Sequence, residues 1–347
     1  MRMDQHTESL WSEVAGVPHE HALPAGVSVV IPVYNSEATL PELILRLSKV
    51  LPDCSERYEA ILVNDGSQDS SWEAVCRLAK QYPWVRGINL MRNFGQHNAT
   101  LCGVRAARYD VTVTMDDDLQ HPPAEVPKLL NELVKGYDLV YGTPRNVPHS
   151  WYRTLSSRLV KRALAAAMRQ PTMVNVIAFR AFRTNIRSAS ASYTSPRLLL
   201  DVLLGWGTTK ITAVPIQYDS RLQGKSNYTF GKLLAMAILL WTSYTTIPLR
   251  LASMVGFLFV FFGVMVLGYV VGTFFLQGSI PGFPFLASLI AIFSGVQLFT
   301  LGIVGEYLAN VFDHSLNRPI YLIKGMATQS ECTLADEHDR RSLSPNT

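Results

Sequence analysis

The chain has 347 residues, enough for about two domains, and carries a formal net charge of +4. Charged residues make up 17% of it, against about 25% in a typical soluble protein. So small a net charge gives no support for nucleic-acid binding, and we predict no nucleic-acid partner; phosphate-bearing ligands or an anionic membrane surface suit it equally well. No charged residue occurs between positions 251 and 305, so a polar front half precedes an apolar back half.

Residues 1–26 contain acidic side chains and no apolar run of the kind found in a signal peptide, so we predict a flexible N-terminal lead. From residue 27 onward, β-branched runs alternate with segments of helical periodicity. Alternation of this kind predicts an α/β domain with a mostly parallel, Rossmann-like sheet. The predicted strands are 27–34, 58–63, 85–90, 111–115 and 138–141, and the predicted helices are 37–51, 71–81, 96–108 and 124–135.

Polar residues follow four consecutive predicted strands, at positions 34–35, 64–67, 92–93 and 116–118. Parallel sheets bind ligands at the carboxyl ends of their strands, so we expect these residues to share one rim. The chain has no GxGxxG after its first strand and no GxxxxGK[ST]. The sequence therefore lacks the main motifs that would support a dinucleotide-dependent oxidoreductase or a P-loop NTPase.

Three consecutive acids, Asp116, Asp117 and Asp118, follow an apolar strand. They can be a solvated loop with a helix N-cap, or a site for Mg²⁺ or Mn²⁺ with phosphate oxygens. We prefer the metal site because a cation offsets the repulsion among the acids. Asp65 lies on the same predicted rim and can accept hydrogen bonds from a base edge or ribose hydroxyls, and Gly66 allows a sharp turn there.

Two apolar segments, 251–276 and 285–307, are each long enough for the roughly 20 residues that cross a membrane. Basic residues flank both, which predicts a multi-pass inner (cytoplasmic) membrane protein whose front domain faces the cytosol. We predict a juxtamembrane amphipathic helix at 231–250 rather than a third span, and a cytoplasmic tail at 311–347. The basic segment 150–169 is either a surface helix or a helix lying on anionic lipid.

The segments VVIPVYN, VNDGSQDS and MDDDLQHPP together resemble family-two glycosyltransferases of the GT-A fold. The segments MRNFGQHNA, DSRLQGKSNYT, TTIPLR and GEYLANVFDHSLNRPIYLI extend the resemblance to the polyprenyl-phosphate glycosyltransferases. Within that group the chain is similar to the formamido-arabinose, bactoprenol glucosyl and dolichyl-phosphate mannose transferases. The resemblance runs from about residue 27 to residue 324. It implies a GT-A catalytic domain at 27–230, followed by two transmembrane helices within 251–310.

The resemblance also implies roles for individual residues. The metal ligands are Asp116 and Asp118, and the nucleotide-binding residues are Pro32, Tyr34, Asp65, Arg92 and Asp116. The acceptor phosphate is bound by Arg221, Lys225 and Ser226, and catalysis is carried by Asp118, Arg221 and Lys225. This chain departs from the family pattern at Asp117, where Ala is usual, so Asp117 is either a spectator or alters metal preference. A second departure is at Lys225 and Asn227. Related enzymes often have Lys at the position of Asn227, so in this chain the positive charge lies two positions earlier.

The expected reaction is an inverting transfer of a sugar from a nucleotide-sugar, UDP-linked, to a membrane polyprenyl phosphate such as undecaprenyl phosphate. The cofactor is Mg²⁺ or Mn²⁺, and the product serves cell-envelope glycan or lipid modification. A phosphate nucleophile is already ionised, so no strong base is required, and we interpret His97 as structural. The alternatives are a processive polysaccharide synthase, whose usual QxxRW motif is missing, and a non-catalytic membrane scaffold, which the intact acids disfavour. A homo-oligomer such as a tetramer is compatible with the resemblance.

Overall fold

The computed structural model describes residues 24–144, 178–190, 199–217, 246–277, 282–316 and 318–329. Most of the predicted N-terminal lead, the basic segment 150–169 and most of the predicted juxtamembrane helix lie outside these ranges. The same holds for the end of the chain beyond residue 329.

The front half is built on one mixed sheet of eight strands in the order β7-β5-β6-β4-β1-β2-β3-β8. The central strands β4, β1, β2 and β3 run parallel, whereas β6 is antiparallel to both β4 and β5. The strand bounds are β1 Val27–Val33, β2 Tyr58–Asn64, β3 Val85–Leu90, β4 Val111–Thr114, β5 Leu139–Pro144, β6 Arg180–Arg183, β7 Ile211–Ile216 and β8 Ile323–Ala327.

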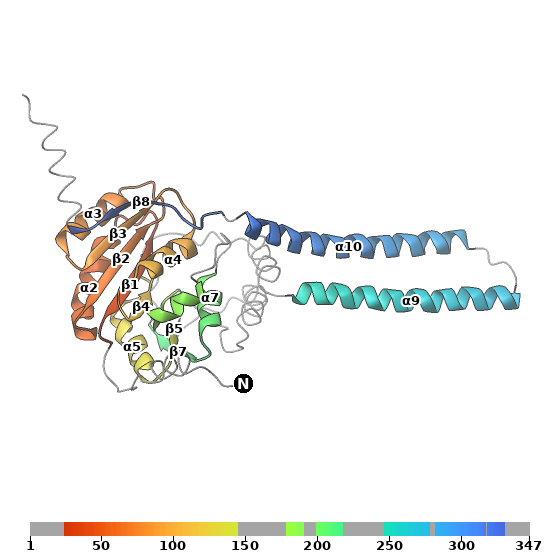
Figure 1. Cartoon of the computed structure of the whole chain (residues 1–347), viewed down its shortest axis with the longest axis horizontal. Coiled ribbons are helices and arrows are strands. Elements are labelled where there is room, and N and C mark those ends of the chain that lie inside the picture. The colour runs from red at the N-terminus through yellow and green to blue at the C-terminus, as the bar shows by residue number, and fades with distance from the viewer. Residues whose placement is uncertain are drawn as a thin grey trace, which may run out of the picture.

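Helices cover both faces of this sheet (Figure 1). One apolar core joins the sheet to α2 (Leu40–Cys54), α3 (Ser71–Gln81) and α5 (Val126–Val134), the last preceded by a short 3-10 helix. A second core joins the other face to α4 (Gln96–Ala106) and α7 (Leu200–Gly207). Every strand and helix predicted between residues 27 and 141 is present, with its ends shifted by a few residues. The α/β prediction is therefore confirmed.

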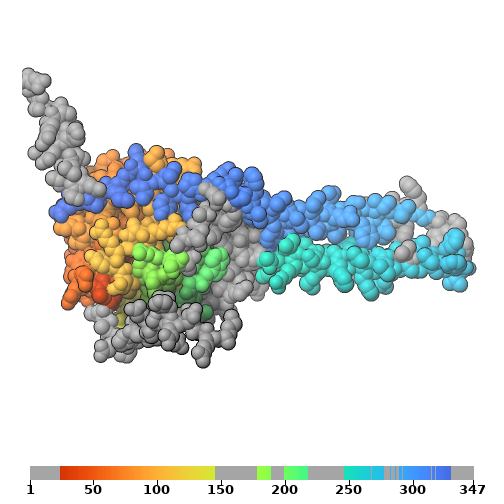
Figure 2. Space-filling view, viewed as in Figure 1, coloured from red at the N-terminus to blue at the C-terminus, as the bar shows by residue number. Residues whose placement is uncertain are grey.

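The back half is a hairpin of two long helices, α9 (Ile247–Gln277) and α10 (Phe283–Ser315), that extends away from the sheet domain (Figures 1 and 2). Within them, an 18-residue window of Ile247–Leu276 has a mean hydropathy of 2.5 and one of Ile292–Asp313 a mean hydropathy of 1.4. Both segments are long and apolar enough to cross a membrane. Each helix extends beyond the span predicted for it, because backbone hydrogen bonds continue past the apolar segment, as from the Arg250 amide to the Thr246 carbonyl over 3.0 Å and from the Leu316 amide to the Phe312 carbonyl over 3.2 Å.

After α10 the chain returns to the sheet, within the segment 311–347 that we predict to be a cytoplasmic tail. Strand β8 pairs antiparallel with β3, and the amide of Met91 donates to the carbonyl of Leu322 over 2.9 Å. Ile320 and Ala327 are buried against the domain. Without β8, strand β3 would be an edge strand with unpaired backbone groups, which gives the physical reason for this return.

Candidate active site

The carboxyl ends of β1, β2 and β4 and the loop after β3 meet around one pocket of about 440 Å³. This volume is in the usual range for a small-molecule site. Five of the predicted site residues line it, and Arg92 lies beside it on the loop that follows β3. The lining residues are Pro32, Val33, Tyr34, Asn35, Ser36, Asp65, Asn93, Gly95, Gln96, Asp116, Asp117 and Asp118.

Asp117 holds the loop between β1 and α2. Its Oδ2 accepts hydrogen bonds from the Tyr34 amide over 3.0 Å and from the Ser36 hydroxyl over 2.5 Å. Burial raises the pKa of this carboxyl, and the bond from Ser36 partly opposes that rise. The side chain therefore faces the β1 loop, and its position gives it a structural task that neither sequence interpretation anticipated.

Asp65 organises the loop between β3 and α4. Its two carboxylate oxygens accept from the amides of Phe94, over 2.7 Å, and Gly95, over 2.9 Å. Burial raises the pKa of Asp65, while the two amide donors lower it. Gly66, with a φ of +65°, packs so closely that a Cβ there would lie 2.5 Å from the amide nitrogen of Asn93. The loops after β2 and β3 are thus built as one unit.

Arg92 lies on that unit with its side chain outward. Its guanidinium carbon is 4.9 Å from the centre of the Phe94 ring, the residue whose amide binds Asp65. The predicted nucleotide-binding residue Arg92 therefore packs on the Phe94 ring and does not itself line the pocket.

Asp116 and Asp118 form a candidate metal site together with His121. Their ligand atoms all lie within 4.8 Å of one another, and this group is the one found among the described residues. Gln96 donates from Nε2 to Oδ1 of Asp116 over 2.5 Å, and the amide of Gln120 donates to Oδ1 of Asp118 over 3.1 Å. Hard carboxylate oxygens with a nitrogen donor suit a divalent cation, so the residues present fit a metal.

A buried arginine lies beneath the acids. Arg180 on β6 is the register partner of Thr114, donates from Nε to the Thr114 hydroxyl over 3.0 Å, and forms an ion pair with Asp201 of α7. Its charge and the effect of burial together lower the pKa of His97, with burial the larger cause, to about 4. His97 is therefore neutral near pH 7, in agreement with its interpretation as structural.

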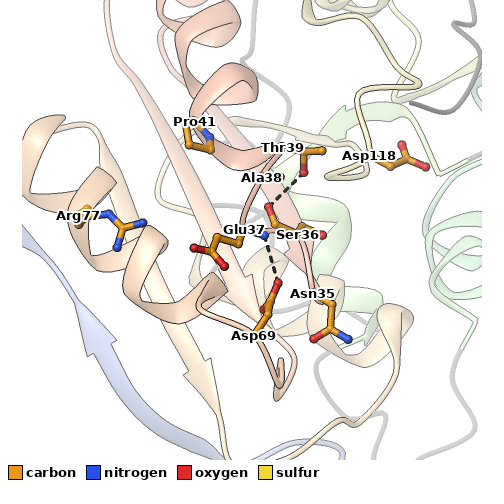
Figure 3. Close-up of a pocket in the computed structure, with 9 residues that line it drawn as sticks. All are labelled: Asn35, Ser36, Glu37, Ala38, Thr39, Pro41, Asp69, Arg77 and Asp118. Carbon is orange, nitrogen blue, oxygen red and sulfur yellow. Dashed lines mark hydrogen bonds between the residues drawn. The ribbon is translucent and has the colours of Figure 1, made fainter. Parts of the chain in front are cut away.

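A second hollow of about 550 Å³ adjoins the first on the side of α2 and α3. Figure 3 shows its lining, in which the amide of Glu37 donates to Asp69 and Arg77 projects from α3. Asn35, Ser36 and Asp118 line both hollows, so the β1 loop separates them. Asp118 is therefore reachable from two directions, whereas Asp116 faces only the first hollow.

Three of the predicted residues, Arg221, Lys225 and Ser226, lie outside the described residues. Residues of the site that were not predicted include Ser36, Gln96, His121 and Arg180. The position of His121, directly after DDDLQ, is a signal that sequence reasoning had available. Arg180 carries no such signal, because only the pairing of β6 with β4 brings it under the acids.

Comparison with known proteins places this geometry in a family. Residues 28–191 match the model of the family described as glycosyl transferase family 2. The chain is 30% identical over 323 residues to the undecaprenyl-phosphate 4-deoxy-4-formamido-L-arabinose transferase of Enterobacter sp. (strain 638), covering 90% of this chain and 97% of that protein. Its identity to the protein of the same name from Shewanella sediminis (strain HAW-EB3) is 34% over 325 residues, covering 90% and 96%.

Among solved structures, glucosyl-3-phosphoglycerate synthase from Mycobacterium tuberculosis, crystallised with Mn²⁺, uridine diphosphate and phosphoglyceric acid, matches with a TM-score of 0.47 and 22% identity. That match covers 70% of this chain and 82% of the other. The similarity along nearly the whole length of the curated relatives is the decisive finding, and it confirms the predicted resemblance and GT-A fold. The chain belongs to glycosyl transferase family 2.

Proposed function

We propose that this glycosyltransferase moves a sugar from a nucleotide-sugar, UDP-linked, to the phosphate of a membrane polyprenyl phosphate, undecaprenyl phosphate being the expected acceptor. The observation that carries the proposal is the acid pair Asp116 and Asp118, which faces the same pocket as Tyr34 and Asp65. Relatives that match 90% of the chain are named for transfer to undecaprenyl phosphate, which supports this acceptor.

The nucleotide would occupy the 440 Å³ pocket. Tyr34 lines this pocket and is 46% exposed, so its aromatic ring is available for a base to stack on. Asp65 holds the loop that carries Asn93 and Gly95 against this space, and Arg92 stands beside it as a donor for the base or its phosphates. Rigid loops of this kind position the donor sugar without reorganisation.

Asp116 and Asp118 would hold a divalent cation, Mg²⁺ or Mn²⁺. When bound, such an ion supplies positive charge to the departing diphosphate. Gln96 and the Gln120 amide orient the two carboxylates, and Asp117 holds the loop opposite them. The chain's own contribution is therefore a preorganised set of oxygens directed toward the space that the diphosphate would fill.

In the chemical step, an oxygen of the acceptor phosphate forms a bond to the anomeric carbon while the bond from that carbon to the diphosphate oxygen breaks. Attack from the face opposite the leaving group inverts the anomeric centre. The acceptor phosphate is already ionised, so the neutral His97 is not needed as a base. Asp118 would also orient the acceptor, and Arg221, Lys225 and Ser226 are predicted to bind the phosphates, with Arg221 and Lys225 stabilising the departing charge.

The hairpin α9–α10 would place the enzyme in the inner (cytoplasmic) membrane, with the sheet domain in the cytosol. The basic residues Arg250, Arg318 and Lys324 flank the hairpin on the side of the sheet domain, which supports this orientation. An acceptor dissolved in the bilayer would then meet a site tethered close to its phosphate. A homo-oligomer such as a tetramer is part of this proposal.

The test is product formation in membranes that contain undecaprenyl phosphate, Mn²⁺ or Mg²⁺ and a panel of radiolabelled UDP- and GDP-sugars. We expect a lipid-linked product from one donor with the wild type, its loss with Asp118→Ala, and its retention with Asp117→Asn. A polymeric product would instead favour a processive synthase. If the wild type bound no nucleotide with either metal, the scaffold alternative would replace the enzyme.

A further inference from the structure

We infer that His121 is the third protein ligand of the metal at Asp116 and Asp118, and that its imidazole gives this enzyme a preference for Mn²⁺ over Mg²⁺. The inference rests on the proposed function, because it assumes a divalent cation at the acid pair. It goes further in naming a nitrogen ligand and in choosing between two metals.

The geometry carries this inference. The ligand atoms of Asp116, Asp118 and His121 all lie within 4.8 Å of one another. An octahedral ion with bonds of about 2.1 Å brings its ligand atoms to within about 4.2 Å of one another. The group therefore needs to close by at most about 0.6 Å, which rotation of the Asp116 and Asp118 side chains toward the fixed imidazole would supply.

The backbone and a neighbouring ring direct His121 toward the acids. Leu119 has a φ of +62°, a left-handed conformation that is uncommon for a leucine, and it turns the chain back between Asp118 and His121. The His121 ring then stacks on Phe179, with centroids 5.4 Å apart and planes 12° from parallel. The imidazole is thus held in one orientation before any ion arrives.

Burial also limits the competition of water for the imidazole. His121 is only 2% exposed, so its ring nitrogens meet little solvent. A neutral imidazole offers a nitrogen lone pair, which is what a divalent cation requires of a ring ligand.

The donor set decides the preference between the metals. Mg²⁺ favours sites made entirely of oxygen and retains its waters, whereas imidazole nitrogen is a better ligand for first-row transition metals. Two carboxylates with one imidazole therefore discriminate toward Mn²⁺. Replacement of His121 by Asn removes the nitrogen, keeps a polar side chain of moderate size, and should remove that discrimination.

The experiment uses the full chain in detergent with UDP and Mn²⁺, observed by electron spin echo envelope modulation, which detects nitrogen bound to Mn²⁺. We expect a nitrogen coupling in the wild type that changes from ¹⁴N to ¹⁵N on histidine-selective labelling. His121→Asn should abolish it, and His97→Asn, the matched control on α4, should retain it. In parallel titrations, His121→Asn should weaken Mn²⁺ binding about tenfold and Mg²⁺ binding less than about twofold.

A wild-type complex that binds Mn²⁺ without a histidine coupling would overturn the inference, and labelling decides this even if His121→Asn fails to fold. An unchanged Mn²⁺ to Mg²⁺ ratio in a folded His121→Asn would overturn the stated preference. In both cases sugar transfer by the wild type would leave the proposed function intact. No Mn²⁺ binding by the wild type in the presence of UDP would overturn both.

Discussion

The sheet domain and the helical hairpin treat apolar side chains in opposite ways. In the sheet domain Ile31, Leu62 and Phe182 are fully buried, whereas on the hairpin Phe257 is 78% exposed and Phe275 is 82% exposed. The first pattern excludes water and the second suits contact with lipid, so the two regions are built for different solvents. The difference teaches that the same residue type must be judged by what surrounds it.

The largest expected effect comes from placing one substitution in both regions. Phe262→Arg puts a charge near the middle of α9, where a central arginine costs about 3 kcal/mol of membrane insertion. Leu45→Arg puts the same charge on α2, where the leucine is 43% exposed to water. We expect Phe262→Arg to lower the membrane-integrated fraction after carbonate extraction and Leu45→Arg to leave it unchanged. Equal loss in both would contradict the assignment of the hairpin to lipid.

The second prediction compares two acids in the rim, the buried Asp65 and the partly buried Asp117. Asp65 accepts through both oxygens, whereas Asp117 accepts both of its described bonds through one oxygen. An asparagine has one acceptor oxygen, so Asp65→Asn loses one of these two bonds and places an NH₂ donor against a part-buried amide, at a cost of about 1 to 3 kcal/mol. Asp117→Asn keeps both bonds. We expect a lower melting temperature and weaker UDP binding only for Asp65→Asn, checked by thermal unfolding and calorimetry.

The third prediction tests the segment that joins the two regions. The Tyr321 hydroxyl and the Cys102 thiol share a hydrogen bond, and the guanidinium carbon of Arg105 lies 5.9 Å from the Tyr321 ring centre. Tyr321→Ala should destabilise the domain by about 1 to 2 kcal/mol and speed hydrogen exchange in residues 318–329. Leu322→Ala, at a side chain that is 51% exposed, is the control. If the two variants exchange equally, the side chain of Tyr321 does not hold β8.

Much of the fold was predictable because its signals are local. β-branched runs such as 27–34 and amphipathic segments such as 71–81 specify their own structure. The polar ends of four strands meet because parallel strands end at one edge. The two apolar segments were equally plain, since length and the missing charges determine them.

What the sequence did not reveal depends on pairing over long distances. Arg180 on β6 pairs with Thr114 on β4, which lies 66 residues earlier in the chain, so the burial of Arg180 beneath the acids has no local pattern. Strand β8 is short and follows the long apolar helix α10, so the sequence predicts no strand within the segment 311–347. The role of Asp117 arises from a loop 81 residues earlier in the chain, so the run of three acids alone gave no sign of it.

The smallest expected effect concerns a polar atom inside the sheet domain. Tyr141 on β5 is fully buried, and its hydroxyl has no hydrogen-bond partner among the described residues. Burial raises its pKa to about 12, so the hydroxyl stays protonated. A buried hydroxyl without a partner carries a desolvation cost, and Tyr141→Phe removes it while keeping the ring that packs in the second core.

We expect Tyr141→Phe to raise the free energy of unfolding by up to about 1 kcal/mol, measured by denaturant unfolding of the detergent-solubilised chain. Tyr58→Phe, at a partly buried ring on β2 that packs edge-on against Trp84, provides the control and should change stability little. A loss of stability in Tyr141→Phe would mean that a water or a ligand satisfies the hydroxyl. Such a group would lie beside Arg180, directly beneath the acid pair, and would extend the polar network of the site into the core.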